Sequence, residues 1–120
     1  MRDSGSATIE FALVLPVLLL VLLACVEVVV LARAQLELGH ATREGARQAA
    51  TSPDVERAIA VVRRSLNDEA ATRVTVSIER QEHVGGTARV STNLRHPIAS
   101  PLFGGFTVAL TSSAVMRVER

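Results

Sequence analysis

Residues 11–32 read FALVLPVLLLVLLACVEVVVLA, and Glu27 is the one charged residue among them. As an α-helix these positions span about 33 Å, at roughly 1.5 Å per residue, which is long enough to cross the hydrocarbon core of a bilayer. A helix also pairs its backbone polar groups internally, as lipid requires. Pro16 removes one backbone donor and should bend the helix locally. The sequence therefore predicts a membrane-spanning helix near the N-terminus.

Two interpretations of this segment involve its removal or lipidation. A cleaved secretory signal peptide would begin with a basic region, but here Arg2 is offset by Asp3, and Glu10 lies against the apolar run. In the second interpretation residues 22–25 (LLAC) resemble a lipobox, and Cys25 would be lipidated. The sequence after Cys25 continues as helix where a lipoprotein has a polar tether, which favours a small apolar membrane residue at that position.

A third interpretation starts from the order of Gly5, four further residues, Glu10 and then the long apolar helix. This order resembles type IV prepilins. The resemblance implies cleavage after Gly5 by a prepilin peptidase, a leader formed by Met1–Gly5 and a new N-terminus at Ser6. It also implies that Glu10 pairs with the Ser6 amine of an adjacent subunit, where opposite charges offset one another's desolvation. The alternative is that Glu10 marks the membrane boundary.

The apolar run is followed by a polar stretch that also suits helix. Residues 33–50 contain no proline, and a continuous helix from residue 6 to 50 would be about 68 Å long. Small or apolar residues recur at helical spacing on one face, which would let another element approach the backbone closely: Leu38, Thr42, Gly45 and Ala49, with Ala41 and Ala46 beside them. Glu27 would lie about 24 Å from Phe11, near the far interface.

Three blocks of the sequence together resemble a known family. Residues 7–16 (ATIEFALVLP), 41–47 (ATREGAR) and 109–117 (ALTSSAVMR) are similar to the TadE-like pseudopilins of tight-adherence (Flp) pilus systems. The resemblance does not decide whether the chain is an E-type or an F-type relative. It implies a minor pilin of the cytoplasmic membrane, with one membrane span and its head outside the cytoplasm. The implied partners are other pilins, the pilus assembly platform, a prepilin peptidase and membrane lipid.

The middle block contains charged side chains at helical spacing. The resemblance suggests subunit contacts at Arg43, Glu44, Gly45 and Arg47, and the alternative is a solvated helix face with internal ion pairs. The expected organisation is a leader at 1–5, a transmembrane and assembly helix at 6–32, its extracytoplasmic continuation at 33–50, and a small head at 51–120.

The remaining residues predict a small α+β head. Ser52 is a suitable N-cap with Pro53 at the first helical position, and a short amphipathic helix should extend to about Ala70. Alternation then predicts a strand at 73–80, a turn at Gly85-Gly86 and a second strand at 88–94. A loop is expected at 96–105, followed by one last strand or a bulged pair at 106–110 and 113–118. The fold class is α+β and pilin-like, with three or four antiparallel strands.

Motifs of catalysis and cofactor binding are not found in the sequence. His40, His83 and His96 are scattered, without the spacing of metal ligands. The glycine pairs have turn chemistry and form no phosphate loop or dinucleotide fingerprint. A net charge of +1 and the lack of Trp and Tyr argue against nucleic-acid binding. We therefore expect no enzyme, cofactor or metal; the alternative to a pilin is a lipoprotein or a bitopic binding module.

Overall fold

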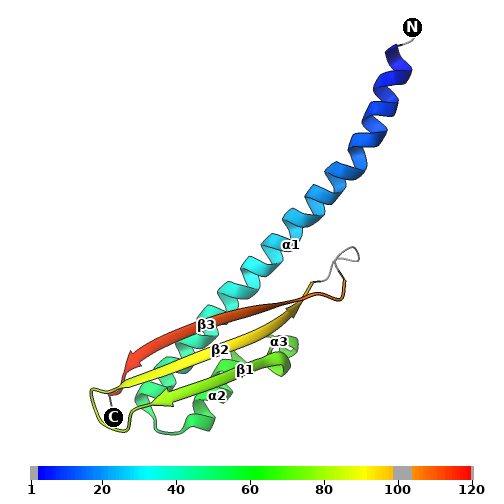
Figure 1. Ribbon diagram of the computed structural model, residues 1–120. Coiled ribbons are helices and arrows are strands. Elements are labelled where there is room, and N and C mark those ends of the chain that lie inside the picture. The colour runs from blue at the N-terminus through cyan, green and yellow to red at the C-terminus, as the bar shows by residue number, and fades with distance from the viewer. Residues whose placement is uncertain (1–2, 99–103, 120) are drawn as a thin grey trace.

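The computed structural model describes residues 3–98 and 104–119, which form one long helix and a small head (Figure 1). Helix α1 (Asp3–Thr51) extends beyond the head in its N-terminal part. Helices α2 (Val55–Arg64) and α3 (Asp68–Arg73) and strands β1 (Val74–Arg80), β2 (Thr87–Pro97) and β3 (Thr107–Arg117) complete the head around the C-terminal part of α1. The molecule measures 83 × 23 × 17 Å. The predicted α+β class, with a long N-terminal helix, is confirmed.

Helix α1 continues through Pro16 and through the end of the apolar run without interruption. Full burial against the head begins beyond the apolar run: Leu38 is the first fully buried residue of the helix. The predicted packing stripe is confirmed, because Leu38, Thr42 and Ala49 are all buried, and Gly45 lies among them. Small side chains on this stripe allow the helix axis to lie close to the sheet and to α2.

The strands form an antiparallel sheet in the order β1-β2-β3. Ile78 pairs with Val90, and Val90 in turn pairs with Ala114. Even-numbered residues of the strands are buried or half-buried against α1, whereas odd-numbered residues lie on the open face and are mostly exposed. The sheet thus has one covered and one solvent-facing side, as period-two alternation requires. The predicted turn at Gly85-Gly86 is confirmed, and Gly85 adopts a φ of 87° that favours glycine.

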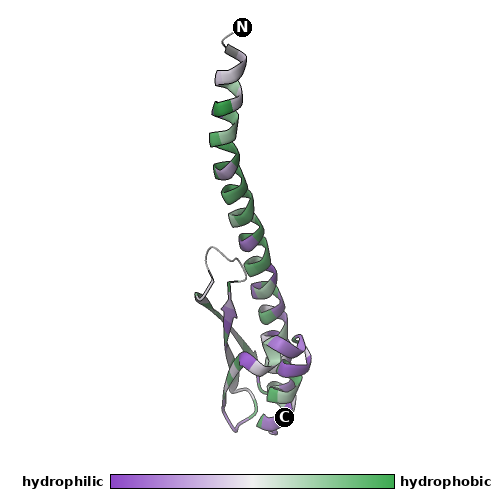
Figure 2. Ribbon diagram, turned by 90° about the vertical axis from the view of Figure 1, so that its right-hand side faces the viewer, coloured by the Kyte–Doolittle hydropathy of each residue, from purple (hydrophilic) through white to green (hydrophobic). Residues whose placement is uncertain are grey.

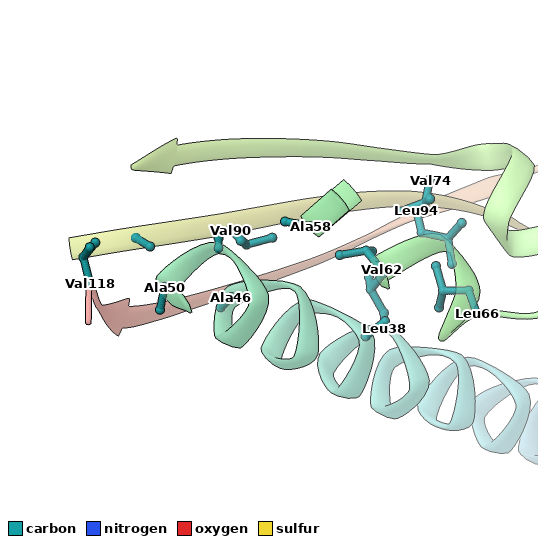
Figure 3. Close-up of a cluster of buried hydrophobic side chains, with 13 residues drawn as sticks. Leu38, Ala46, Ala50, Ala58, Val62, Leu66, Val74, Val90, Leu94 and Val118 are labelled. Atoms are coloured by element: carbon teal, nitrogen blue, oxygen red, sulfur yellow. The ribbon is translucent and has the colours of Figure 1, made fainter. Parts of the chain in front are cut away.

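The core of the head lies between α1, α2 and the covered face of the sheet, as the side chains in Figure 3 show. Val62 of α2 and Val90 of β2 are fully buried there. A β-carbon at Gly45 would overlap Cγ2 of Val62, so glycine is required at this crossing of α1 and α2. Arg80 donates from Nε to the carbonyl oxygen of Ala49 at 2.9 Å, which ties β1 to the end of α1. A head of this size depends on α1 for one wall of its core.

The segment between α1 and β1 differs from the prediction of one helix that extends to about Ala70. Helix α2 ends at Arg64, and α3 begins at Asp68. The amide N–H of Ser65 bonds to Val61 and Val62 carbonyls, and the Asn67 side chain accepts from the N–H of Ala70 at 2.8 Å. Asn67 therefore caps a new helix, because an Asn side chain satisfies a free N–H at a helix start.

The N-cap of α2 was predicted at Ser52, and this prediction is wrong. Asp54 is the N-cap, and its Oδ1 accepts from the N–H of Arg57 at 3.2 Å. Ser52 instead accepts from the N–H of Asp54 through its hydroxyl oxygen at 3.3 Å. Pro53 consequently lies one residue before the cap, in the turn that leaves α1.

The second strand is longer than predicted, and the third agrees with the single-strand alternative. Strand β2 extends to Pro97, and β3 is one continuous strand whose register with β2 holds from Thr107 to Arg117, so no bulged pair interrupts it. The loop expected at 96–105 is therefore shorter at its start, and its residues 99–103 lie outside the described residues.

Candidate functional site

The exposed part of α1 is the largest apolar surface that the structure describes. Exposed side chains such as Phe11 (65%), Leu13 (71%) and Val29 (66%) follow one another around the whole helix. Figure 2 shows this apolar stretch running from near the N-terminus down to the head, where hydrophilic and hydrophobic segments alternate. Such a surface is far larger than water-soluble monomers expose. Within the described residues, α1 is the one helix long and apolar enough to span a membrane.

Gly5 and Ser6, the predicted processing site, lie within the first turns of α1. Both residues are exposed, and a β-carbon at Gly5 would meet no atom within 4 Å. The hydroxyl of Thr8 donates to the carbonyl oxygen of Ser4 at 2.9 Å, which supports the helix over these residues. Residues 1–2 of the predicted leader lie outside the described part of the chain.

Glu10 lies one turn beyond Ser6 on the same exposed helix. Within residues 3–98 and 104–119, no group forms a hydrogen bond or an ion pair with its carboxylate. Ile9 (66% exposed) and Phe11 (65%) flank it. A carboxylate placed among apolar side chains at the edge of a membrane is costly unless it is paired or neutralised. If the apolar part of α1 lies in a membrane, the described residues of one copy supply no counter-charge for Glu10.

Glu27 is the second carboxylate on the apolar part of α1. Glu27 is half-buried. Its Oε2 atom is shielded from solvent and has no hydrogen-bond partner among the residues described. Cys25, two residues before it, is exposed and lies in a shallow apolar hollow with Val21 and Val28. The helix continues through both positions to Thr51.

The charged block that was predicted to contact other subunits divides into two sets. Gly45 is buried against α2, so it packs within the chain. Arg43 and Arg47 are exposed on α1, and Glu44 is half-buried beside them. Arg47 also borders a hollow with Met116 and Arg117 of β3. Glu44 accepts from Arg47 through its two oxygens at 2.6 and 3.3 Å. The alternative interpretation, an ion pair within one helix, thus accounts for two members of the block.

Hydrogen bonding to Arg47 sets the protonation behaviour of this pair. It lowers the pKa of the Glu44 carboxyl below its usual value, and the same contact raises the pKa of the Arg47 guanidinium. Arg47 is 68% exposed and Glu44 45% exposed at the side chain, so water screens the attraction. The pair leaves one exposed cation, Arg43, one turn earlier on the same side of the helix.

The described residues contain no group of three or more His, Cys, Asp or Glu side chains that could hold a metal ion. A groove of about 260 Å³ between α1, α3 and the end of β2 includes Glu37, Glu69, Arg73 and His96. Arg73 and Glu69 are paired at 2.6 Å, one helical turn apart on α3. His40 and His83, the other histidines, are exposed and do not line this groove.

Comparison with known proteins agrees with the resemblance found in the sequence. A family model described as TadE-like protein matches residues 5–47, which include Gly5, Glu10, the apolar run and the charged block. Comparisons with curated proteins and with solved structures gave no significant match. The predicted similarity to TadE-like proteins is confirmed over this segment.

Proposed function

We propose, from the match to TadE-like proteins over residues 5–47, that this chain is a minor pilin or pseudopilin that takes part in assembly of a tight-adherence pilus. The observation that supports this most directly is the exposed apolar length of α1, which begins with a carboxylate, Glu10, that has no partner among the described residues. Such a helix requires lipid or neighbouring helices around it. The chain's role in this proposal is structural and non-catalytic.

The membrane anchor is the first step of the proposal. The apolar run of α1 spans the cytoplasmic membrane, and the head that surrounds the C-terminal part of α1 lies outside the cytoplasm. A continuous helix through Cys25 to Thr51 supports retention of the anchor on the mature protein. In the proposal, a prepilin peptidase cleaves between Gly5 and Ser6, and the new amine at Ser6 then lies at the end of the anchor.

The second step is pairing between copies or related pilins. Glu10 lies four residues along α1 from Ser6, which corresponds to about 6 Å of helix rise. A neighbour whose Ser6 amine reaches Glu10 is therefore displaced by about one helical turn toward the head. This displacement is a translation along the helix, so each subunit offers Glu10 to one neighbour and its amine to another. Contacts of this head-to-tail kind continue in one direction and produce filaments where they do not close.

The third step uses an exposed side of α1. Exposed residues recur there at helical spacing: Arg33, Leu36, His40, Arg43 and Arg47. Leu36 is 64% exposed and adds an apolar side chain to this surface. In the proposal this side, with Glu44, contacts neighbouring subunits or the assembly platform, whereas Gly45 fixes the position of α2.

Mass spectrometry of the mature protein, purified from its native membrane, tests the proposal. An N-terminus at Ser6 supports it, and the variant Gly5→Leu should retain Met1 because the peptidase then meets a bulky side chain at the cleavage site. The matched control is Gly39→Leu, which changes a glycine of the same helix far from this site. Normal maturation of Gly5→Leu would contradict the proposal.

The alternative, a lipoprotein or a bitopic binding module, gives a different result in the same measurement. Lipidation at Cys25 would require removal of residues 1–24, so the mature chain would begin with a modified Cys25. Its mass would include an acyl-glycerol group, and Cys25→Ser would abolish that group. An unmodified Cys25 within a chain that begins at Ser6 excludes lipidation at that site.

A further inference from the structure

We infer that the end of the β2–β3 hairpin, formed by Ile98 and Phe106, is a second membrane contact that lies in the outer interface of the bilayer that α1 spans. This inference rests on the proposed membrane anchor and adds a surface to it. Strand β2 ends at Pro97 and β3 begins at Thr107, and the two residues pair with one another. Just beyond them, the Ile98 N–H donates to the Phe106 carbonyl oxygen at 3.0 Å, so the hairpin ladder extends to this end.

The position of the hairpin end along α1 follows from two contacts. Thr92 of β2 is hydrogen-bonded to Thr42 of α1 at 2.7 Å, which sets the two elements level at that point. The five residues from Thr92 to Pro97 cover about 16 Å of strand, equal to about 11 residues of helix. Pro97 should therefore lie level with a residue near Leu31. The groove that Pro97 shares with Val30 and Ala34 confirms this level.

The hairpin end thus lies beside the apolar run and not beside the polar part of α1. One further strand residue places Ile98 and Phe106 about 3 Å closer to the N-terminus, level with the last turns before Ala32. Figure 1 shows this end of the sheet directed along α1 toward the N-terminus, and the C-terminus at the opposite end of the head. If the run of residues 11–32 lies in hydrocarbon, its last turns lie at the outer interface, and the hairpin end lies there too.

The side chains at this end are suited to lipid. Phe106 is one of three aromatic residues in the chain, and its side chain is 66% exposed. The sequence from Pro97 to Met116 contains no Asp, Glu, Lys, Arg or His. Aromatic side chains are favourable at the boundary between headgroups and acyl chains, where water covers one side and hydrocarbon the other. An exposed phenylalanine at this depth is therefore accounted for by lipid contact.

The opposite end of the sheet has the reverse composition. Charged residues gather around the β1–β2 turn and the ends of the paired strands: Glu79, Arg80, Glu82, Arg89, Arg117 and Glu119. At the hairpin end the nearest such side chains are Arg95 and His96, and none follows until Arg117. A sheet with most of its charges at one end has a preferred orientation at a membrane, because charged groups lose hydration in the interface. The orientation that this asymmetry favours is the one that α1 imposes, with the uncharged end toward the bilayer.

A single tryptophan tests the inference, since the chain contains none. The full chain with Phe106→Trp is reconstituted in phosphatidylcholine vesicles, with and without bromine on the acyl chains, and iodide is added to the water. Two matched variants bracket it: Leu18→Trp on exposed α1, and Val84→Trp in the β1–β2 turn, where Val84 is 71% exposed. Phe106 is mostly exposed, so the larger ring can extend into solvent or lipid. Circular dichroism verifies the fold of each variant.

The expected result is that brominated lipid quenches the tryptophans at 18 and 106, whereas iodide quenches the one at 84. The emission from position 106 should also be shifted to shorter wavelength than that from position 84. If position 18 is quenched by lipid and position 106 only by iodide, the hairpin contact is excluded and the anchor stands. If brominated lipid does not quench the tryptophan at position 18, the proposed membrane anchor is excluded. The inference about the hairpin end is then excluded as well.

A third result would assign the hairpin end to protein. Shielding of position 106 from both quenchers, which increases with the protein-to-lipid ratio, would mean that a second copy of the chain covers Phe106. That result would overturn the lipid contact. Shielding of position 106 from iodide alone, independent of this ratio and combined with quenching by brominated lipid, would support it.

Discussion

The hydroxyl groups of Thr42 and Thr92 form a buried hydrogen bond of 2.7 Å between α1 and β2. Thr42 also donates to the carbonyl oxygen of Leu38 at 2.7 Å. A hydroxyl group has one hydrogen, so Thr42 accepts from Thr92 when it donates to Leu38. The Thr92 hydroxyl also lies 3.4 Å from the Ser112 carbonyl oxygen, which can accept from it. The bond between Thr42 and Thr92 is a polar contact inside an otherwise apolar core, and it sets the position of the sheet along the helix.

The first prediction concerns this pair. Thr92→Val and Thr42→Val should each lower the free energy of unfolding by about 1 kcal/mol, because each leaves a buried hydroxyl without its partner. The double variant should lose less than the sum, since two apolar groups of the same shape replace the bond. Denaturant titration of the full chain in detergent micelles measures this. Thr75→Val, on the open face of the sheet, is the control, and additive effects of the two variants would contradict the prediction.

The second prediction compares two glycines of α1. Gly45→Ala should destabilise the head by about 1–3 kcal/mol, because the added β-carbon overlaps Cγ2 of Val62 and forces α2 to move. Gly39→Ala is the matched control: its β-carbon would meet Arg43 and Ser112 atoms at 3.9 Å, which is ordinary contact. Alanine also favours the helix, so this variant should be neutral or more stable. If the two variants unfold at the same midpoint concentration of denaturant, the packing of α2 does not require glycine at position 45.

The third prediction concerns the exposed carboxylate of the apolar helix. Glu10→Gln should lower incorporation into the pilus more than about tenfold, because the neighbour's amine then remains buried without a counter-charge. Processing should be unchanged, with Ser6 as the N-terminus. Glu56→Gln, the same change in the exposed first turn of α2, should leave assembly intact. Quantification of the chain in sheared surface fractions, beside the membrane pool, measures the difference; equal incorporation of Glu10→Gln and the parent would exclude the pairing.

The fourth prediction is a dependence on pH. Arg47 lowers the pKa of Glu44 in the folded chain, so the stabilisation from this pair is present above the pKa of the unfolded carboxyl. It is lost as the pH falls through the lower, folded value. In Arg47→Gln, an NMR titration should show the Glu44 pKa move up toward its ordinary value. Arg63→Gln, on α2, is the control and should leave Glu44 unchanged. The effect on stability should be small because both side chains are exposed to water.

Periodicity was sufficient to predict the elements that depend on one strong pattern. The apolar run and the helical spacing of Leu38, Thr42, Gly45 and Ala49 gave the extent of α1 and its buried stripe, because both patterns extend over many turns. Alternation of Val74, Val76 and Ile78 likewise located β1. Both patterns arise because one side of an element is buried. One-sided burial gives a periodic spacing of apolar residues, which can be recognised in the sequence.

The residues that cap the helices and end the strands could not be predicted from periodicity. Leu66 lies at helical spacing from Val62, so one helix was expected, but the turn that contains Leu66 also buries it. Asn67 could have indicated the break, since Asn is a strong N-cap. Likewise Asp54 competes with Ser52 as a cap, and backbone geometry after Pro53 decides between them. Strand β3 remained uncertain because Thr111-Ser112-Ser113 is polar on both faces, and Ser112 is half-buried in spite of its hydroxyl.

The candidate site was predictable as a set of exposed residues but not as a set of contacts. Glu10 and Arg43 lie on the surface as a helix requires, and the structure of one chain contains no partner for the Glu10 carboxylate among its described residues. The role of Gly45 required the position of α2, which no local pattern specifies. Intersubunit pairing depends on a second chain and therefore stays a prediction.

Helix α1 has no hinge between the part that projects from the head and the part that carries the head. The molecule, which is 83 Å long, should therefore move as one rigid body. A tilt of the anchor by about 20°, common for membrane helices, would displace the far end sideways by about 28 Å. In the proposed orientation, a change in the tilt of the anchor therefore moves the head sideways across the outer surface. A neighbour that restrains one end of the molecule then restrains both ends.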